Sequence, residues 1–193
     1  MKAAGRASKY HPALATLHWV LAWFIIASLA FGFLVLARVP NTDPRKLDML
    51  EWHMGLGMAI FAAMAVRLVV RWRTAKPAPA GLGTPASARA ARWAHLAFYV
   101  LVAGMVATGY ATGLIAHLND SVFARSGELL PASFEGYPTF RAHGAIAAVL
   151  AVMIALHVLG ALWHWLARRD GVMRRMGFGD RRVDPAGVAK VPA

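Results

Sequence analysis

The chain has 193 residues, of which 59% are hydrophobic and 16% are charged, and its mean hydropathy is +0.49. This composition is too apolar for a soluble protein and leaves four windows long enough to cross a hydrocarbon core. Cysteine is absent, which excludes disulfides, thiolate metal sites and iron–sulfur clusters.

The net charge of +12 is distributed by loop and does not form a binding patch. Lysines and arginines concentrate in the N-terminal lead-in, in the 73–92 connection and in the tail beyond residue 167, whereas the two other loops mix cations with acids. The positive-inside rule therefore predicts that the N- and C-termini are both cytoplasmic, and the same distribution excludes a nucleic-acid-binding role.

Four membrane spans are expected in chain order, at about residues 12–37, 47–72, 90–117 and 142–167. Because backbone groups in lipid must be satisfied internally and no span alternates with period two, each span is predicted to be an α-helix. The predicted fold class is an all-α integral membrane protein. It consists of one antiparallel four-helix bundle domain, residues 1–178, in the lipid bilayer.

The connections between the spans differ in character. The short outer loop 38–50 is rich in turn residues, and the Pro/Ala/Gly-rich inner connection 74–88 is predicted to be mobile. The long outer loop 118–140 is predicted to fold back over the outer end of the bundle, because it carries large apolar side chains such as Phe123, Leu129, Leu130, Phe134, Tyr137 and Phe140. The basic tail, residues 179–193, is predicted to be disordered and cytoplasmic.

The last span is apolar but contains His143, His157 and His164. The fourteen-residue step from His143 to His157 returns to the same helix face within about 40° and separates the rings by about 21 Å along the axis. Sorted by depth, His53 pairs with His143 near the outside and His18 pairs with His157 nearer the inside. Each pair joins two different helices.

Two imidazoles that face each other across a bundle predict a metal-containing cofactor with two axial protein ligands. Zinc would require three or four protein ligands at one depth. Haem b fits better, because the spans carry no acid in their interior and have small residues beside the histidines. The prediction is two haem b groups stacked across the membrane, and filled axial positions favour electron transfer over oxygen binding. The alternative for each histidine is a structural hydrogen bond to a neighbouring helix. The small residues expected beside the histidines and the haems are Gly55, Gly57, Gly144 and Gly160.

Four further residues lie near the inner ends of the spans. His95 and His164 either line a quinone pocket beside the inner haem or anchor among lipid head groups. Arg67 and Arg71 either pair with haem propionates or extend to the head groups. The sequence leaves both choices open. A close helix approach is also expected on the third span, at the G-x-x-x-G pair Gly109 and Gly113.

The chain resembles the prokaryotic cytochrome b561 family of four-helix dihaem membrane proteins over about residues 10–178. The resemblance implies that His18 and His157 ligate one haem and that His53 and His143 ligate the other. It also places His95 and His164 near the quinone site. The matching segments are LHW at 17–19, EWHMGLG at 51–57, VRLVVR at 66–71, AHLAFY at 94–99, RAHG at 141–144 and ALHVLGALWHW at 155–165.

Within the family the resemblance is greatest to superoxide oxidases, which implies a superoxide:ubiquinone oxidoreductase in the bacterial inner membrane. Arg38, Arg45, Lys46 and Arg141 are the outer cations expected to attract the anionic donor. The alternative is a non-catalytic dihaem anchor that links a partner dehydrogenase or periplasmic carrier to the quinone pool. A third hypothesis, a transporter or assembly factor, predicts no haem. The sequence predicts no oligomeric state.

Overall fold

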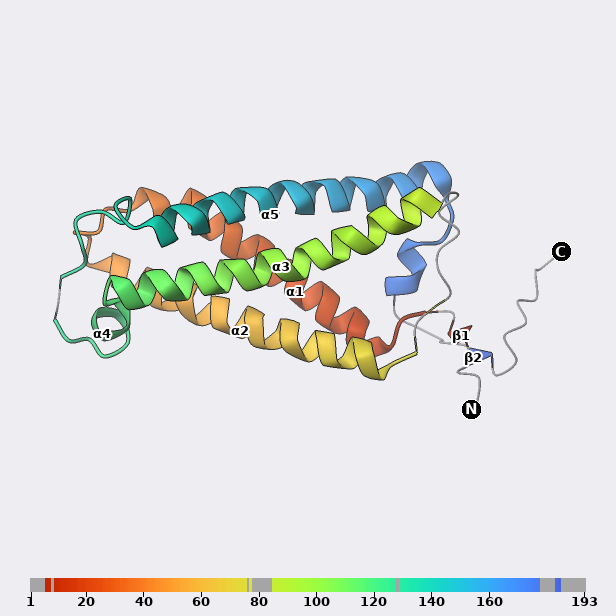
Figure 1. The fold of residues 1–193 in the computed structure, drawn as a ribbon, viewed down its shortest axis with the longest axis horizontal. Coiled ribbons are helices and arrows are strands. Elements are labelled where there is room, and N and C mark those ends of the chain that lie inside the picture. The colour runs from red at the N-terminus through yellow and green to blue at the C-terminus, as the bar shows by residue number, and fades with distance from the viewer. Residues whose placement is uncertain are drawn as a thin grey trace.

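The computed structural model describes residues 6–7, 9–75, 77, 85–127, 129–177 and 183–184. Four long helices form the bundle: α1 (Pro12–Leu34), α2 (Arg45–Arg73), α3 (Pro85–Ile115) and α5 (Pro138–Trp163) (Figure 1). The shorter elements are η1 (Leu36–Arg38), α4 (Leu118–Val122), the π-helical turn η2 (His164–Arg168), η3 (Met173–Met176), and the antiparallel pair of β1 (Arg6–Ala7) and β2 (Val183–Asp184).

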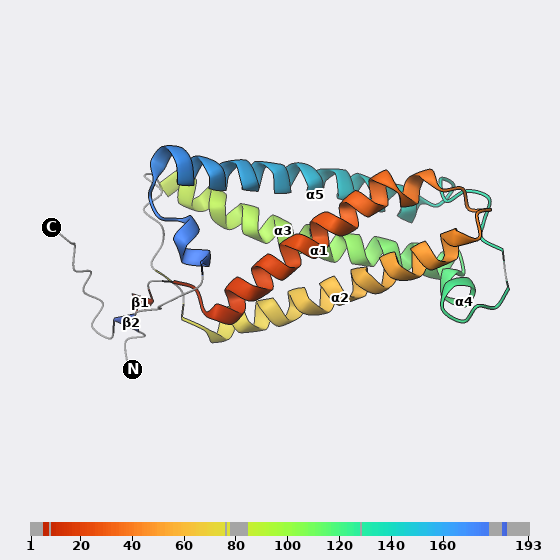
Figure 2. The same ribbon diagram turned by 180° about the vertical axis from the view of Figure 1, so that it is seen from behind.

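Successive long helices run in opposite directions, as the sequence predicts for an antiparallel bundle (Figure 1). The most extensive helix contacts are those of α3 with α5 and of α1 with α2. In the view from behind, α1 crosses the bundle obliquely, from the end of α2 toward the beginning of α5 (Figure 2). Helix α1 contacts α2 more extensively than it contacts α5.

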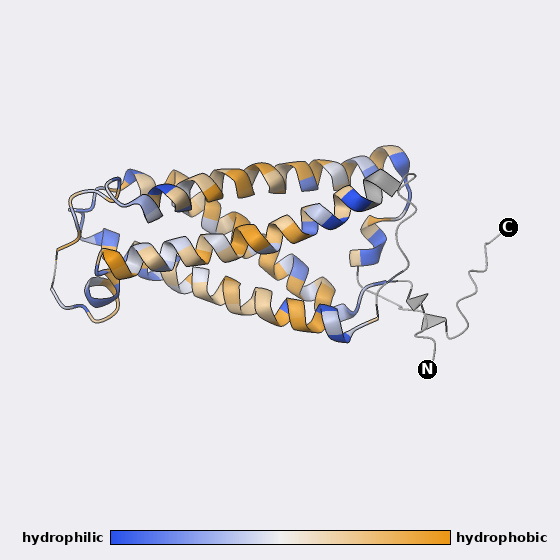
Figure 3. Cartoon of the chain, in the orientation of Figure 1, coloured by the Kyte–Doolittle hydropathy of each residue, from blue (hydrophilic) through white to orange (hydrophobic). Residues whose placement is uncertain are grey.

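The four long helices are long and apolar enough to cross a membrane, with spans at Pro12–Arg38, Arg45–Arg73, Arg89–Ile115 and Pro138–Arg168. In the most apolar window of each span, only 6–17% of the residues are buried inside the protein. Hydrophobic positions run along the middle of the bundle, and hydrophilic ones gather toward its two ends (Figure 3). Lipid is therefore the environment that can cover these outward apolar faces.

A packed layer lies halfway along the bundle. It contains one buried side chain from each long helix, and Leu150 stands seven residues from both His143 and His157. Burial of one apolar side chain per helix at the same depth separates the outer histidine level from the inner one. The four side chains are Leu21, Ile60, Val102 and Leu150.

At the outer end, the 118–140 loop folds back over the bundle, as predicted. Its α4 segment and Phe134 share a core cluster with the first turns of α2 and the end of α3. The Asn41 side chain donates to the Pro131 carbonyl at 2.7 Å and joins the two outer loops. Two of the apolar residues expected to pack inward do not, because Phe123 is 51% exposed and Leu129 is 94% exposed.

At the inner end, α5 continues into η2 and the chain then reverses at Arg169, which has a left-handed backbone (φ 48°). The segment that follows lies against the beginning of α1. The Trp19 indole donates to the Met176 carbonyl at 3.1 Å, and the Tyr10 amide donates to the Arg175 carbonyl at 3.1 Å.

Three of the four predicted helix starts differ from the structure. The third helix begins at Pro85 and not near residue 90, the fourth begins at Pro138 and not at 142, and the second begins at Arg45. Proline is favoured in the first turn of a helix, where its missing N–H costs nothing. Most of the connection predicted to be mobile and most of the tail predicted to be disordered lie outside the described residues, and β2 is the described part of that tail.

Candidate functional site

Two pairs of histidine rings face each other across the bundle at two levels. At the outer level, the ring centroids of His53 on α2 and His143 on α5 are 6.2 Å apart, with an interplanar angle of 78°. At the inner level, those of His18 on α1 and His157 on α5 are 6.3 Å apart, with an angle of 76°. These are the two pairs that the depth of the histidines in the sequence predicts.

The separation of each pair fits one metal atom between two imidazoles. A ring nitrogen binds a metal at about 2 Å and the ring centroid lies about 1 Å behind it, so opposed rings have centroids about 6 Å apart. Among the described residues, no group of three or more histidine, cysteine or acidic side chains can hold a metal ion. A metal held by two imidazoles would need its other ligands from a cofactor, and the four nitrogens of a porphyrin could provide them.

At the outer site, the hydrogen bonds of His143 on α5 determine which of its ring nitrogens carries the proton. The Nδ1–H of His143 donates to the Met105 carbonyl at 2.9 Å, and the Thr108 hydroxyl lies 3.3 Å from the same nitrogen. Because a carbonyl oxygen only accepts, the proton is on Nδ1 and the lone pair of Nε2 is free to ligate a metal. Across the site, Nδ1 of His53 lies 3.5 Å from the Ser28 hydroxyl.

Two glycines on α3 leave room for neighbouring side chains at the outer site. A Cβ added to Gly109 would lie 3.1 Å from Cε1 and 3.2 Å from Nδ1 of His143. A Cβ added to Gly113 would lie 3.3 Å from the Met54 side chain. The two glycines of the pair therefore make room for side chains of two different helices, His143 on α5 and Met54 on α2. By contrast, an added Cβ would meet nothing within 4 Å at the four glycines expected beside the haems, Gly55, Gly57, Gly144 and Gly160.

The inner site contains a third histidine that the depth pairing did not include. The ring centroid of His95 on α3 is 6.1 Å from that of His157, with an interplanar angle of 79°, and the Phe98 ring lies 5.4 Å from the same imidazole. Nδ1 of His95 donates to the Ala91 carbonyl at 2.5 Å, which leaves its Nε2 free. Geometry alone therefore allows either His18 or His95 to oppose His157.

The structure distinguishes the two arginines of α2. Arg67 is buried, with 7% of its surface exposed, and its Nη1 donates to the Tyr99 hydroxyl at 2.6 Å. Its Nε is buried without a hydrogen-bond partner. Arg71, one turn later, is only half-buried. A buried guanidinium with an unsatisfied N–H fits a bound carboxylate, such as the propionate that haem carries.

His164 does not meet His95; among the described residues, no ring contact joins the two. Nδ1–H of His164 donates to the Asp170 carboxylate at 2.6 Å, and Arg168 Nε lies 3.8 Å from the same oxygen. The hydrogen bond from His164 is the main reason that the pKa of Asp170 lies below its ordinary value. Sequence analysis missed Asp170, because only the π-turn and the reversal after it bring the carboxylate back to the histidine.

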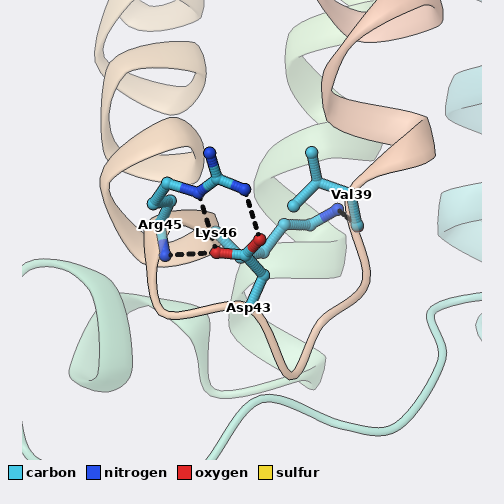
Figure 4. Close-up of polar contacts among 4 residues, drawn as sticks. All are labelled: Val39, Asp43, Arg45 and Lys46. Atoms are coloured by element: carbon cyan, nitrogen blue, oxygen red, sulfur yellow. Dashed lines mark hydrogen bonds and ion pairs between the residues drawn. The ribbon is translucent and has the colours of Figure 1, made fainter.

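Two of the four cations expected to attract an anion are not available for that role. Arg45 is paired with Asp43, whose pKa its hydrogen bonds lower to about 2 (Figure 4). Lys46 is 4% exposed, and its Nζ donates to the carbonyls of Leu36 at 2.5 Å and Val39 at 2.7 Å. Arg38 and Arg141 are exposed and form no ion pair among the described residues.

A cavity of about 480 Å³ opens between the two outer loops. Its wall is mainly apolar and includes Leu47, Leu130 and the exposed Leu129. Arg125, also in the wall, bridges Asp48 at 2.8 Å and Glu51 at 2.5 Å. None of the histidines of the two levels lines this cavity.

Comparison with known proteins identifies relatives for this arrangement. Residues 9–179 match the sequence profile of a family described as "Prokaryotic cytochrome b561". The chain is also similar to a protein of Escherichia coli (strain K12) named "Cytochrome b561 homolog 2", with 25% identity over 173 residues, which cover 87% of this chain and 90% of that protein. The matched region contains all four long helices and both histidine levels.

Proposed function

This chain belongs to the prokaryotic cytochrome b561 family of multi-pass membrane electron-transfer proteins, and on that basis we propose that it is a dihaem superoxide:ubiquinone oxidoreductase. The observation that carries the proposal is the pair of facing histidine couples, at 6.2 Å and 6.3 Å, on two levels of one bundle. The family implies b-type haem. Two such groups would occupy the outer and inner levels in the bacterial inner membrane, with both termini cytoplasmic.

His53 and His143 hold the outer haem in this proposal, and His18 and His157 hold the inner one. Haem b held by these histidines would supply a one-electron couple. The hydrogen bond from His143 to Met105 orients the ligand ring, and the layer of Leu21, Ile60, Val102 and Leu150 excludes water between the levels.

The proposed donor is superoxide on the outer side, and the acceptor is ubiquinone near the inner end. Two superoxide anions lose one electron each and become two dioxygen molecules. Ubiquinone gains the two electrons and two protons from the cytoplasm and becomes ubiquinol. The exposed Arg38 and Arg141 support attraction of the anion.

His164 and Asp170 provide the chemistry needed for a proton near the quinone. The carboxylate accepts Nδ1–H of His164 and so leaves Nε2 as the ring nitrogen that can exchange a proton. Nε2 can then take a proton from water and donate it to a reduced quinone oxygen. His95, beside His157, is the second quinone-facing imidazole in this proposal.

The test is to reconstitute purified protein in vesicles that contain ubiquinone and to generate superoxide outside. Haem reduction should be faster than the uncatalysed background, should disappear when superoxide dismutase is added, and should give one ubiquinol per two superoxide anions. Haem reduction at the background rate would reject superoxide as the donor.

One observation favours a second function, an electron-transfer anchor for a protein donor. Leu129, 94% exposed, and Phe123, 51% exposed, lie on the same outer loop, and Leu129 borders the cavity between the loops. Exposed apolar residues beside a cavity suit a docked protein. This alternative predicts haem reduction by a periplasmic carrier or partner dehydrogenase and none by superoxide. A transporter or assembly factor would show no haem absorption.

A further inference from the structure

Among the described residues, Arg67 is the cation buried at the inner level of the bundle. Arg67 follows His53 on α2 by fourteen residues, the step that separates His143 from His157 on α5. That step is about 21 Å along a helix and keeps the same face within about 40°. Helix α2 thus supplies a metal ligand at the outer level and a guanidinium at the inner one.

The charge of Arg67 has no counter-ion in the part of the chain that the structure describes. It forms no ion pair among the described residues, and its hydrogen-bond partner is the neutral hydroxyl of Tyr99, over whose ring the guanidinium carbon lies at 5.9 Å. No aspartate or glutamate occurs between Glu51 and Asp120, and α1 and α5 contain none. A buried charge without a partner is costly, so the site must gain from it elsewhere.

The inner histidine level has positive side chains close to it, and the outer level does not have them among the described residues. Arg67 is close enough to act electrostatically on His18, His95 and His157, and the half-buried Arg71 also acts on His95. No arginine or lysine of the described residues acts in this way on His53 or His143.

The buried cation of the outer end is placed differently. Lys46 lies seven residues before His53, about 10 Å along the axis. Its ammonium group is bound by the carbonyls of Leu36 and Val39, whose partial negative charges offset it.

A fixed positive charge beside a haem favours the reduced form, because reduction removes one positive charge from the iron. At about 10 Å and an effective dielectric constant of about 20, Coulomb's law gives a change of about tenfold or more in the reduction equilibrium. The sign is the same if the guanidinium neutralises a propionate, since an uncompensated propionate would favour the oxidised form.

We propose that Arg67, held in place by Tyr99, keeps the reduction potential of the inner haem above that of the outer haem. Electrons that enter from the outside then move to the inner level in the favourable direction. This inference rests on the proposed haem ligands. In it, Arg67 acts through its charge on the inner haem and does not contact the substrate.

The test is an anaerobic redox titration followed by the haem absorption spectrum. His143→Ala should remove the outer haem, so that the remaining potential belongs to the inner one. In that background, Arg67→Gln should lower the reduction equilibrium constant of the inner haem about tenfold, which is about 59 mV for one electron. Arg67→Lys should retain most of the wild-type potential, and Tyr99→Phe should have a smaller effect than Arg67→Gln.

Arg73→Gln is the matched control, because Arg73 is an exposed arginine at the end of the same helix. If Arg67→Gln is not recovered with haem, Arg67→Met provides a neutral side chain of similar length for a buried site. An inner potential that changes no more in Arg67→Gln or Arg67→Met than in Arg73→Gln would overturn the inference while leaving the ligands intact. Wild-type protein without haem would overturn both proposals.

Discussion

Gly109 on α3 limits where the ring of His143 on α5 can lie. Gly109 faces His143 so closely that an added Cβ would be 3.1 Å from Cε1 of the ring. The ring cannot easily yield, because its Nδ1–H is bound to Met105 and its other edge faces His53. The His143 ring is held on two sides and therefore has little freedom to move away from a methyl group added at Gly109.

Gly109→Val is therefore expected to displace His143 and to lower occupancy of the outer haem, while the inner haem stays bound. Gly104→Ala is the control on the same helix, because its Cβ would meet the flexible end of Ile146 at 3.3 Å, which can move aside. Haem content and the absorption spectrum of each purified variant measure the effect. Full outer occupancy in Gly109→Val would show that the ring is not confined in this way.

The three histidines of the inner level make a second prediction at the residue scale. The ring centroid of His157 lies 6.3 Å from that of His18 and 6.1 Å from that of His95, and either distance would allow a metal between the two rings. The family resemblance favours His18, so His18→Ala should lose the inner haem and His95→Ala should keep both haems. The reverse result, with loss in His95→Ala alone, would assign α3 instead of α1 to the inner site.

At the scale of elements, the spans were predictable because each is a long apolar window, and the fold followed from their number and loop lengths. The ends were not predictable from hydropathy. The segment before residue 90 is basic and contains several alanines, and it was expected to be a loop, yet α3 begins at Pro85. Alanine and arginine are strong helix formers and proline suits the first turn, so the helix extends beyond its apolar part.

The candidate ligands could also be predicted, because a fourteen-residue step is a property of one helix. Contacts that depend on how the chain reverses could not. Asp170 reaches His164 only through the π-turn and the left-handed Arg169. Lys46 seemed an exposed outer cation, but burial against the end of η1 turns it inward.

The π-turn makes a prediction of its own. Because the pKa of Asp170 is lowered, the carboxylate is ionised at neutral pH and its contact with His164 is lost only as the pH falls through that lowered value. Asp170→Asn should therefore keep both haems and slow ubiquinol formation at least severalfold at neutral pH. His164→Ala should behave similarly, and the double variant should be no slower than either.

The control for this turn is Asp184→Asn, which changes an acid in β2 and not in the turn. Ubiquinol formation in reconstituted vesicles, followed across pH, measures the effect. Unchanged turnover in Asp170→Asn across the pH range would remove the His164–Asp170 contact from the proton path.

At the scale of the whole molecule, the bundle has two levels that share α5. Its His143 and His157 each face a different helix, and the buried layer at Leu150 lies between them. The outer level is bordered by the folded-back loop, and the inner level by Arg67 and the returning segment after η2. The proposal of two haems in a fixed order across the membrane requires such a difference between the two levels.

The most direct test counts haem per chain in the wild type, in His143→Ala and in His157→Ala, with protein quantified independently of absorbance by haem. The account predicts two haems in the wild type and one in each variant, with different reduction potentials for the two that remain. Loss of neither haem in one variant, or loss of both haems in a variant that stays folded, would contradict the assignment of one histidine pair to each haem.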